Sequence, residues 1–235
     1  MHFDPPLMEA TLVRRYKRFL ADVRTGDGRA FTAHCPNTGS MLGCMTPGAR
    51  IWLSHSPDPR RKYAHTWQLV EADGTAVGIN TGLANRLVEE AIASGVISAL
   101  AHWPSVRREV RYGAQRSRID LLLESGHRKC YVEVKNVTAA VDDGVAIFPD
   151  AVSARGARHL EELMLMRREG HQAALVFCVQ RGDVNRVRPA DRIDPVYGER
   201  LREAADAGVQ VMAYGADVGP AGIRLAQPLT VDLSP

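Results

Sequence analysis

The fold of the second half of the chain is decided by residues 117–138, which read SRIDLLLES (117–125), GHRK (126–129) and CYVEVKNVT (130–138). The two outer segments are rich in apolar and β-branched residues, and GHRK between them predicts a tight turn, so they form two antiparallel strands. Residues two apart on a strand share a face. Glu133 and Lys135 therefore point to one side, and pairing the strands about the turn brings Asp120 close to both.

This arrangement suits phosphodiester hydrolysis. Two neighbouring carboxylates, Asp120 and Glu133, can hold Mg²⁺, which keeps several waters and takes further oxygen ligands from a substrate phosphate. A lysine such as Lys135 can orient the attacking water or stabilise the developing negative charge. The same residues also have a plainer interpretation, in which an exposed strand carries Glu133 and Lys135 as a weak surface ion pair.

The scarcity of lysine favours the first interpretation. The chain holds thirty lysines and arginines, of which only four are lysines: Lys17, Lys62, Lys129 and Lys135. A lysine retained beside two carboxylate positions in so arginine-rich a chain is a suggestive observation.

Elements on either side of this hairpin indicate an α/β domain. The segment 83–97, LANRLVEEAIASGVI, has the apolar period of a helix, and further helices are predicted at 153–170 and 194–208. Strands are predicted at 109–113, 173–180 and 209–218. Helices interleaved with strands predict a mixed sheet covered by helices, and the change of pattern near residues 78–83 gives two domains, 1–82 and 83–235.

The first 80 residues have a different pattern. Short runs rich in β-branched and aromatic residues (11–25, 29–35, 49–55, 65–72) alternate with turn segments such as TGDG, PNTGSM and SPDPRRK. This pattern predicts a small β-barrel or sandwich, with an OB-like barrel as one natural form. The polar loop 34–41, HCPNTGSM, is explained by turn chemistry, with Pro36 and Gly39 setting the backbone.

Composition limits the class of protein. The chain has 235 residues, 45% hydrophobic and 24% charged, which is typical of a globular protein. No apolar stretch is long enough for a membrane span, and no secretory signal is evident, so we expect a cytoplasmic protein without a membrane partner. Residues 1–82 hold ten of the thirty basic and seven of the twenty-seven acidic residues. The net charge of +3 therefore lies in the first third of the chain, which points to a polyanionic partner.

Two basic clusters in the first domain are candidate DNA contacts. Arg15, Lys17 and Arg18 lie around Tyr16 and Phe19, and Arg60, Arg61 and Lys62 precede Tyr63. Cations mixed with aromatic residues suit a groove that binds phosphates and stacks bases. The alternatives are an edge strand protected by charge, for the first cluster, and an ordinary solvated face for the basic excess as a whole.

The chain resembles a known family along almost its whole length. The segments RRYKRFLADV, HCPNTGSM, NTGLAN, SRIDLLL, YVEVKNVT and FPDAVSARGARHLEEL are similar to the sugar fermentation stimulation protein A family, and the Asp120, Glu133, Lys135 pattern resembles the PD-(D/E)xK nuclease superfamily. The resemblance implies an N-terminal OB-like β-barrel and a C-terminal nuclease-like mixed-sheet α/β domain. It also implies sequence-nonspecific DNA binding and a link to the regulation of sugar (maltose) metabolism. For the loop HCPNTGSM it offers a binding role at the domain interface as the alternative to turn chemistry.

Carried over to this sequence, the resemblance makes Asp120 and Glu133 metal ligands and Lys135 the catalytic lysine, with Mg²⁺ or Mn²⁺ as the cofactor. It also implies a further carboxylate on the helix before the strands, which is Glu90, with Glu89 as the alternative. On the helix that follows FPDAVS, Arg155 becomes the candidate contact to the substrate phosphate, and Arg155 and His159 share a face because they are four residues apart.

The sequence thus predicts a DNA-binding protein with a Mg²⁺-dependent nuclease site. The first alternative is a non-catalytic DNA-binding regulator that keeps the nuclease fold as a scaffold. An enzyme of sugar metabolism is a third interpretation, without a sugar-binding pattern to support it. A homodimer stays open as the oligomeric state.

Overall fold

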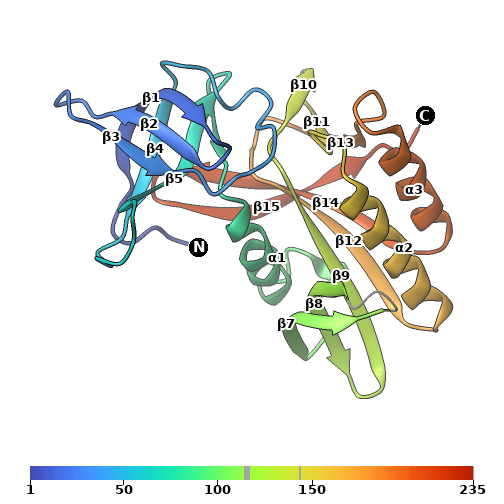
Figure 1. The fold of residues 1–235 in the computed structure, drawn as a ribbon. Coiled ribbons are helices and arrows are strands. Elements are labelled where there is room, and N and C mark those ends of the chain that lie inside the picture. Colours follow the sequence, from blue (N-terminus) through green and yellow to red (C-terminus); the bar gives the residue numbers. More distant parts are fainter. Residues whose placement is uncertain (114–116, 143, 235) are drawn as a thin grey trace.

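The computed structural model describes residues 1–113, 117–142 and 144–234. It has two domains, an N-terminal five-stranded β-barrel and a C-terminal mixed sheet with helices (Figure 1). Both are the domain types that the sequence predicts.

The barrel is formed by short antiparallel strands in the order β3-β2-β1-β4-β5. It closes where β3 pairs with β5, His34 opposite Thr66. A sixth strand, β6, continues from β5. The strands are β1 (Met8–Tyr16), β2 (Leu20–Arg24), β3 (Ala30–His34), β4 (Arg50–His55), β5 (His65–Ala72) and β6 (Thr75–Gly78). Inward-facing residues such as Leu12, Val23, Leu53 and Trp67 fill its interior.

The run 11–25, which looks continuous in sequence, is divided between β1 and β2. Lys17 and Arg18 have φ of 50° and 67° and make the reversal. Glycine, asparagine and aspartate are the usual residues in this left-handed conformation, so neither lysine nor arginine marks the turn in the sequence.

The C-terminal domain contains a nine-stranded sheet in the order β10-β11-β13-β15-β14-β12-β9-β8-β7. Its first elements are η1 (Thr81–Leu83), α1 (Ala84–Ala93), η2 (Ser98–Leu100), β7 (Ser105–Tyr112), β8 (Ser117–Ser125), β9 (Arg128–Val137), β10 (Ala140–Asp142) and β11 (Val145–Phe148). Its later elements are α2 (Ala154–Arg168), β12 (Gln172–Val179), β13 (Arg186–Pro189), α3 (Pro195–Asp206), β14 (Gln210–Gly219) and β15 (Gly222–Val231).

Helices cover both faces of the central strands (Figure 1). On one face, Val132 and Val134 of β9 pack in a core with Leu87 of α1. On the other, Leu175 and Phe177 of β12 pack with residues of α2 and α3. The alternation of β9 therefore directs Glu133 and Lys135 toward α2, as the strand period predicts.

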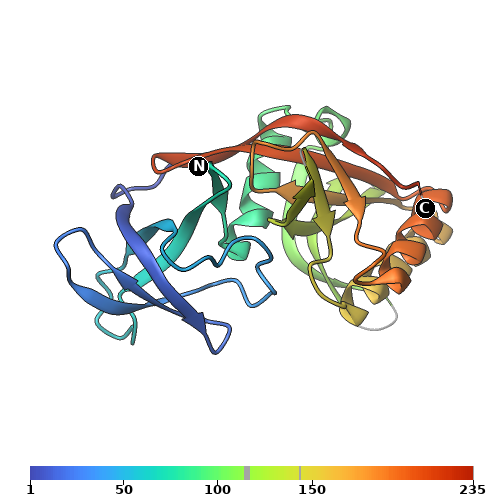
Figure 2. The ribbon, with the colours of Figure 1, turned by 90° about the horizontal axis from the view of Figure 1, so that it is seen from above.

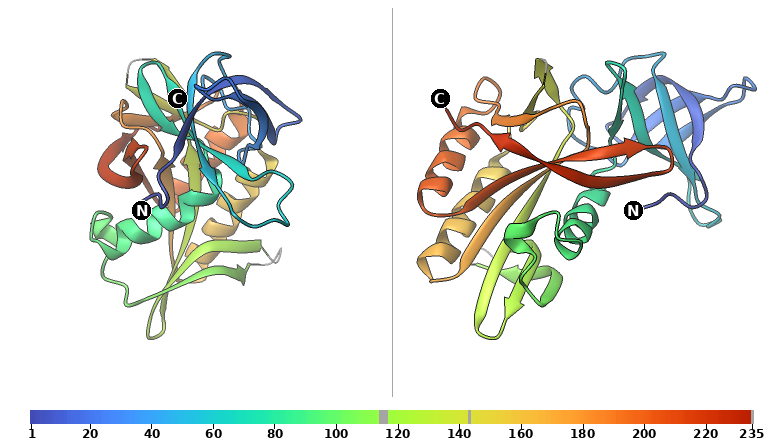
Figure 3. Two further views of the ribbon diagram at one scale, coloured as in Figure 1. Left: turned by 90° about the vertical axis from the view of Figure 1, so that its left-hand side faces the viewer. Right: turned by 180° about the vertical axis from the view of Figure 1, so that it is seen from behind.

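The hairpin of β14 and β15 ties the start of the chain to the second domain. In Figure 2 it runs above both domains, and in the right panel of Figure 3 its tip reaches the N-terminus. His2 forms a bridge with Gly222, and Phe3 N–H donates to Ala221 O at 3.0 Å. None of the helices in the described residues is long and apolar enough to cross a membrane.

Candidate metal and nuclease site

The site lies where β8 and β9 separate. The two strands pair from Ser125 opposite Arg128 to Leu121 opposite Val132, around a turn at Gly126 and His127. One residue before Leu121, the side chain of Asp120 takes the place of a main-chain hydrogen-bond acceptor. Its Oδ2 accepts the N–H of Val134 at 2.7 Å. The register places Asp120 across from Glu133, as the sequence predicts.

Glu133 is almost fully buried, with 2% of its surface exposed. Its Oε1 accepts hydrogen bonds from Lys135 Nζ at 2.8 Å and from His159 Nδ1. Burial alone would raise the pKa of Glu133, but the hydrogen bond from His159 and the positive charge of Lys135 outweigh it and lower the pKa. Within the described residues Oε2 is buried and has no hydrogen-bond partner, which leaves it with unused acceptor capacity.

Asp120 has the opposite electrostatic balance. Burial and the nearby charge of Glu133 raise its pKa to about 6, although Val134 N–H and Asn85 Nδ2 donate hydrogen bonds to it. Two carboxylates that repel each other in a poorly solvated site form a favourable place for a divalent cation.

Two residues of α2 complete this group. Arg155 Nε donates to His159 Nε2 at 3.2 Å, so we assign the imidazole proton to Nδ1, which donates to Glu133. Lys135 Nζ lies 3.4 Å from the same Nδ1. The helix is held in place by its cap, because Ser153 Oγ accepts the N–H of Gly156 at 3.0 Å. His159 thus fixes the orientation of Glu133 and leaves Oε2 free.

All three core residues line one cavity of about 490 Å³, together with Asn85, Glu109 and Arg155. The structure therefore brings together Asp120, Glu133, Lys135 and Arg155, four of the predicted site residues.

The structure does not bring Glu90 to this cavity. Its carboxylate pairs with the Met1 amino group at 2.8 Å and with Arg86 at 2.7 Å, and Glu89 pairs with Arg108. The structure therefore places neither glutamate in the cavity, and the role of Glu90, or of Glu89, as a metal ligand stays a prediction that this geometry does not support. The physical reason is that α1 points its first turn at the cavity, so Asn85 reaches Asp120 at 2.9 Å while the glutamates lie one turn further along.

Asn85 and Glu109 are site residues that sequence reasoning missed. Glu109 lies on β7 in a left-handed conformation, with φ of 54°, and Asn85 Nδ2 lies 3.5 Å from its carboxylate. Such a conformation in a residue other than glycine is strained and frequent at functional sites. The segment NTGLAN around Asn85 was the only signal, and it identified no single residue.

The predicted DNA contacts of the barrel form two clusters, and the first lies next to the loop 37–39. Arg15 donates to the carbonyl oxygens of Asn37 and Gly39, and Arg18 donates to that of Thr38 at 2.8 Å, so both brace the loop 37–39. Lys17 is exposed beside them.

The second cluster lies in the loop between β4 and β5. Arg60 pairs with Asp58 at 2.9 Å, Arg61 donates to Thr66 Oγ1 at 3.1 Å, and Lys62 lies over Tyr63. Neither these geometries nor those of Arg15, Lys17 and Arg18 test DNA binding, which stays a prediction.

The residues around Asp120 and Glu133 suit a metal ion that has few protein ligands. Across residues 1–113, 117–142 and 144–234, no three His, Cys, Asp or Glu side chains form a ready-made metal cage. Two carboxylates with one unpartnered buried oxygen suit a hard cation that keeps part of its water shell, as Mg²⁺ does.

Comparison with known families accounts for both domains. Residues 82–222 match the model of the sugar fermentation stimulation protein RE domain, and residues 13–79 match the N-terminal OB domain of the same family. The chain belongs to the sugar fermentation stimulation protein family.

Members of this family are similar to the chain over its full length. A sugar fermentation stimulation protein homolog from Thioalkalivibrio sulfidiphilus is 78% identical over 234 residues, which cover 100% of this chain and 99% of the relative. A homolog from Teredinibacter turnerae is 56% identical, with coverage of 99% and 100%.

A solved structure supports the same assignment. The family member from Pyrococcus furiosus, solved in complex with Ca²⁺, is 30% identical, covers 99% of this chain and 98% of its own, and superposes with a TM-score of 0.89.

Proposed function

We propose that this family member hydrolyses phosphodiester bonds in DNA in a divalent-metal-dependent reaction, with Asp120, Glu133 and Lys135 as the catalytic group. The observation that carries the proposal is the convergence of these three side chains on one cavity, where the buried Oε2 of Glu133 lacks a partner in the described chain. The restriction-endonuclease-like class of the matched domain agrees with this chemistry.

Asp120 and Glu133 would hold the metal. The relative from Pyrococcus furiosus was solved with Ca²⁺, which supports a divalent ion here, and we propose Mg²⁺ or Mn²⁺ as the active one. When bound, such an ion supplies Lewis-acid stabilisation of the phosphate oxygens and a more acidic water.

The protein's own groups would position the substrate and move the proton. Lys135 Nζ lies 2.8 Å from Glu133 and would be free to reach the attacking water or a phosphate oxygen when Glu133 serves as a metal ligand. Arg155 is exposed at the edge of the cavity, where its guanidinium can bind a flanking phosphate. The basic clusters of the barrel would add contacts that do not depend on sequence, and a role in sugar (maltose) gene regulation would follow from DNA binding.

The test is cleavage of supercoiled plasmid DNA by the purified full chain with Mg²⁺ or Mn²⁺. We expect nicking that EDTA stops, at least a hundredfold loss in Lys135→Ala, and DNA affinity unchanged within about twofold in that variant. Lys129→Ala is the matched control, because Lys129 lies on the same strand but outside the cavity.

A non-catalytic DNA-binding regulator is the second candidate. It is favoured by the engagement of Lys135 with Glu133 and His159, which resembles a closed structural network. Wild-type chain that binds DNA but leaves it intact in both metals would establish this function and exclude the nuclease.

A further inference from the structure

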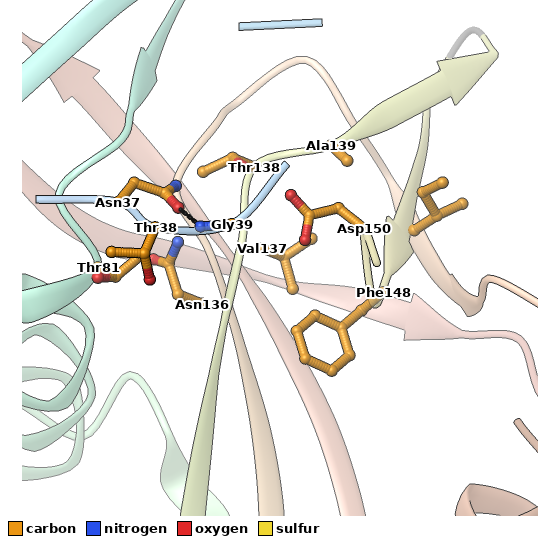
Figure 4. Close-up of a pocket in the computed structure, with 11 residues that line it drawn as sticks. Asn37, Thr38, Gly39, Thr81, Asn136, Val137, Thr138, Ala139, Phe148 and Asp150 are labelled. Carbon is orange, nitrogen blue, oxygen red and sulfur yellow. Dashed lines mark hydrogen bonds between the residues drawn. The ribbon is translucent and has the colours of Figure 1, made fainter. Parts of the chain in front are cut away.

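A second cavity adjoins the catalytic one, between the barrel and the C-terminal domain (Figure 4). Its volume is about 160 Å³, and it shares Thr81, Asn136 and Phe148 with the catalytic cavity. Strand β9 runs past both, since Glu133 and Lys135 face the first and residues 136–137 line the second. A group bound in the second cavity would therefore lie next to a phosphodiester bond held in the catalytic cavity.

The barrel side of this cavity is firmly held. Arg15 binds the carbonyl oxygens of Asn37 and Gly39 at 2.8 and 2.9 Å. From the other domain, Asp150 accepts the N–H of Met41 at 2.9 Å, and its carbonyl oxygen accepts Ser40 Oγ at 2.8 Å. The loop is thus fixed before any ligand arrives, which lowers the entropic cost of binding.

Three polar groups face the cavity with their other atoms already used. Asn37 is 4% exposed, and its Oδ1 accepts the N–H of Gly39 at 2.8 Å, so its Nδ2 remains a free donor (Figure 4). Asn136 Oδ1 accepts a hydrogen bond from Gln180, which leaves Asn136 Nδ2 as a second free donor. Asp150 uses Oδ2 for Met41, and within the described residues its Oδ1 has no hydrogen-bond donor.

The charge of the cavity excludes a phosphate. The residues around it include no lysine or arginine, and Asp150 is its only charged side chain among the described residues. A phosphate would meet repulsion there, whereas a neutral heterocycle would meet two N–H donors, one carboxylate acceptor and the half-buried ring of Phe148. Aromatic rings are common surfaces for nucleobases.

We propose that this cavity binds one unpaired nucleobase of the substrate, adjacent to the cleaved bond, and prefers cytosine to uracil. The exocyclic amino group of cytosine would donate to Asp150, and its ring N3 and carbonyl O2 would accept hydrogen bonds from the amides of Asn37 and Asn136. Uracil places a carbonyl oxygen against the same carboxylate. The position relative to the cleaved bond rests on the proposed function, whereas the base preference rests on this cavity alone.

The test measures binding without cleavage. Fluorescence anisotropy with the full-length Lys135→Ala chain in Mg²⁺ compares oligodeoxycytidylate with oligodeoxyuridylate of the same short length. We expect about tenfold tighter binding of the cytosine oligomer, since one well-placed base contact is worth about that factor or more. A single cytosine moved through the uracil oligomer should give the gain at one position.

Asp150→Asn is the decisive variant. Met41 N–H would hold the new amide oxygen where Oδ2 now lies, so the amide NH₂ would face the cavity and the preference should vanish or invert. Asp217→Asn, an exposed residue paired with Arg224 on β14 and β15, removes the same charge elsewhere and should keep the preference.

The outcomes separate the two proposals. Equal affinity for both oligomers, no affinity for either, or a preference that survives Asp150→Asn overturns the base site. Plasmid cleavage by the wild type, measured separately, decides the nuclease proposal: a cytosine preference without cleavage upholds the base site alone, and cleavage without a preference upholds the nuclease alone.

Discussion

In the metal-free protein, ionisation of the Asp120 carboxyl lowers the free energy of unfolding, and this effect can be measured. Its pKa is raised from 3.8 to about 6, so the fold favours the protonated carboxyl. The stability that this preference contributes is present below pH 4 and is lost as the pH rises through about 6, a total of about 3 kcal/mol. We therefore predict that Asp120→Asn raises the free energy of unfolding at pH 7 by up to about 3 kcal/mol without metal.

Urea unfolding at pH 4 and pH 7, with and without Mg²⁺, checks this prediction. The difference between wild type and variant should be small at pH 4 and large at pH 7. Added Mg²⁺ should stabilise the wild type more than the variant, because a neutral amide is a weaker ligand for Mg²⁺ than a carboxylate. An Asp120→Asn chain that is less stable than the wild type at pH 7 without metal would contradict it.

His159 provides a second prediction for a single residue. Because its Nδ1 orients Glu133, we expect His159→Ala to weaken Mg²⁺ binding about 10- to 100-fold, the usual effect of removing a group that positions a metal ligand. His159→Asn, whose amide can donate from nearly the same place, should recover most of the affinity. Calorimetric titration with Mg²⁺ measures both, with the exposed His127→Ala as the control.

A fold defect alone would give another pattern. Equal loss of metal affinity in His159→Ala and His159→Asn would show that the imidazole acts by packing and does not position Glu133.

The convergence of Asp120, Glu133 and Lys135 was predictable because it depends only on a short turn and the two-residue period of strands. The helix residue that joins them was not. Glu89 and Glu90 fit the expected position in sequence, but the packing of α1 gives Asn85 the contact with Asp120. That choice depends on the rotation of a helix against a sheet, which local sequence does not encode.

At the scale of secondary structure, the packing of α2 predicts an effect of a glycine-to-alanine change that is opposite to the one from helix propensity. Alanine in place of glycine inside a helix normally stabilises it by about 1 kcal/mol. At Gly156, however, an added Cβ would lie 2.8 Å from Ser153 Oγ and 3.1 Å from the buried ring of Tyr197 on α3. We expect Gly156→Ala to lower the free energy of unfolding by about 1–3 kcal/mol, the typical cost of overpacking.

Thermal or urea unfolding measures this effect, and the exposed Arg158→Ala on the same helix should change stability by less than about 0.5 kcal/mol. A stabilised Gly156→Ala would mean that α2 can move away from α3 at no cost.

The predicted elements differ from the observed ones where tertiary contacts decide the conformation. The helices α1, α2 and α3 have clear apolar periods, Ser153 and Asp194 cap the starts of α2 and α3, and the sequence predicts all three helices. Strand β15 contains Pro228, which disfavours a strand in sequence. Strands β10, β11 and β13 have three or four residues each, too few for an alternating pattern.

At the scale of the whole molecule, the sequence separates two domains but does not show how they share a surface. Asp150 and the loop 37–41 are more than 100 residues apart, yet their contacts close the second cavity. Gly39 leaves little room there, because an added Cβ would lie 3.2 Å from the Asp150 carboxylate. A polar loop of this kind looks like an ordinary turn until its partner domain is in place.

The distribution of charge supplies the last prediction. The excess of positive charge lies in residues 1–82, and the loop 60–62 supplies three of the ten lysines and arginines in that segment. If this loop touches DNA phosphates, replacing Arg60, Arg61 and Lys62 together by alanine should make the logarithm of affinity less dependent on the logarithm of salt concentration. The slope should fall by about 1 to 3, close to one unit for each phosphate contact that is lost.

Duplex binding measured by anisotropy at several salt concentrations gives this slope. The matched control replaces three exposed arginines of the other domain, Arg128, Arg168 and Arg224, so that the net charge changes equally. A steeper salt response in the control than in the 60–62 variant shows a local contact, because a long-range effect of net charge would alter both slopes alike. Equal slopes in the two variants would remove the loop from the DNA-binding surface and leave Arg155, beside the catalytic cavity, as the remaining predicted phosphate contact outside the Arg15, Lys17 and Arg18 cluster.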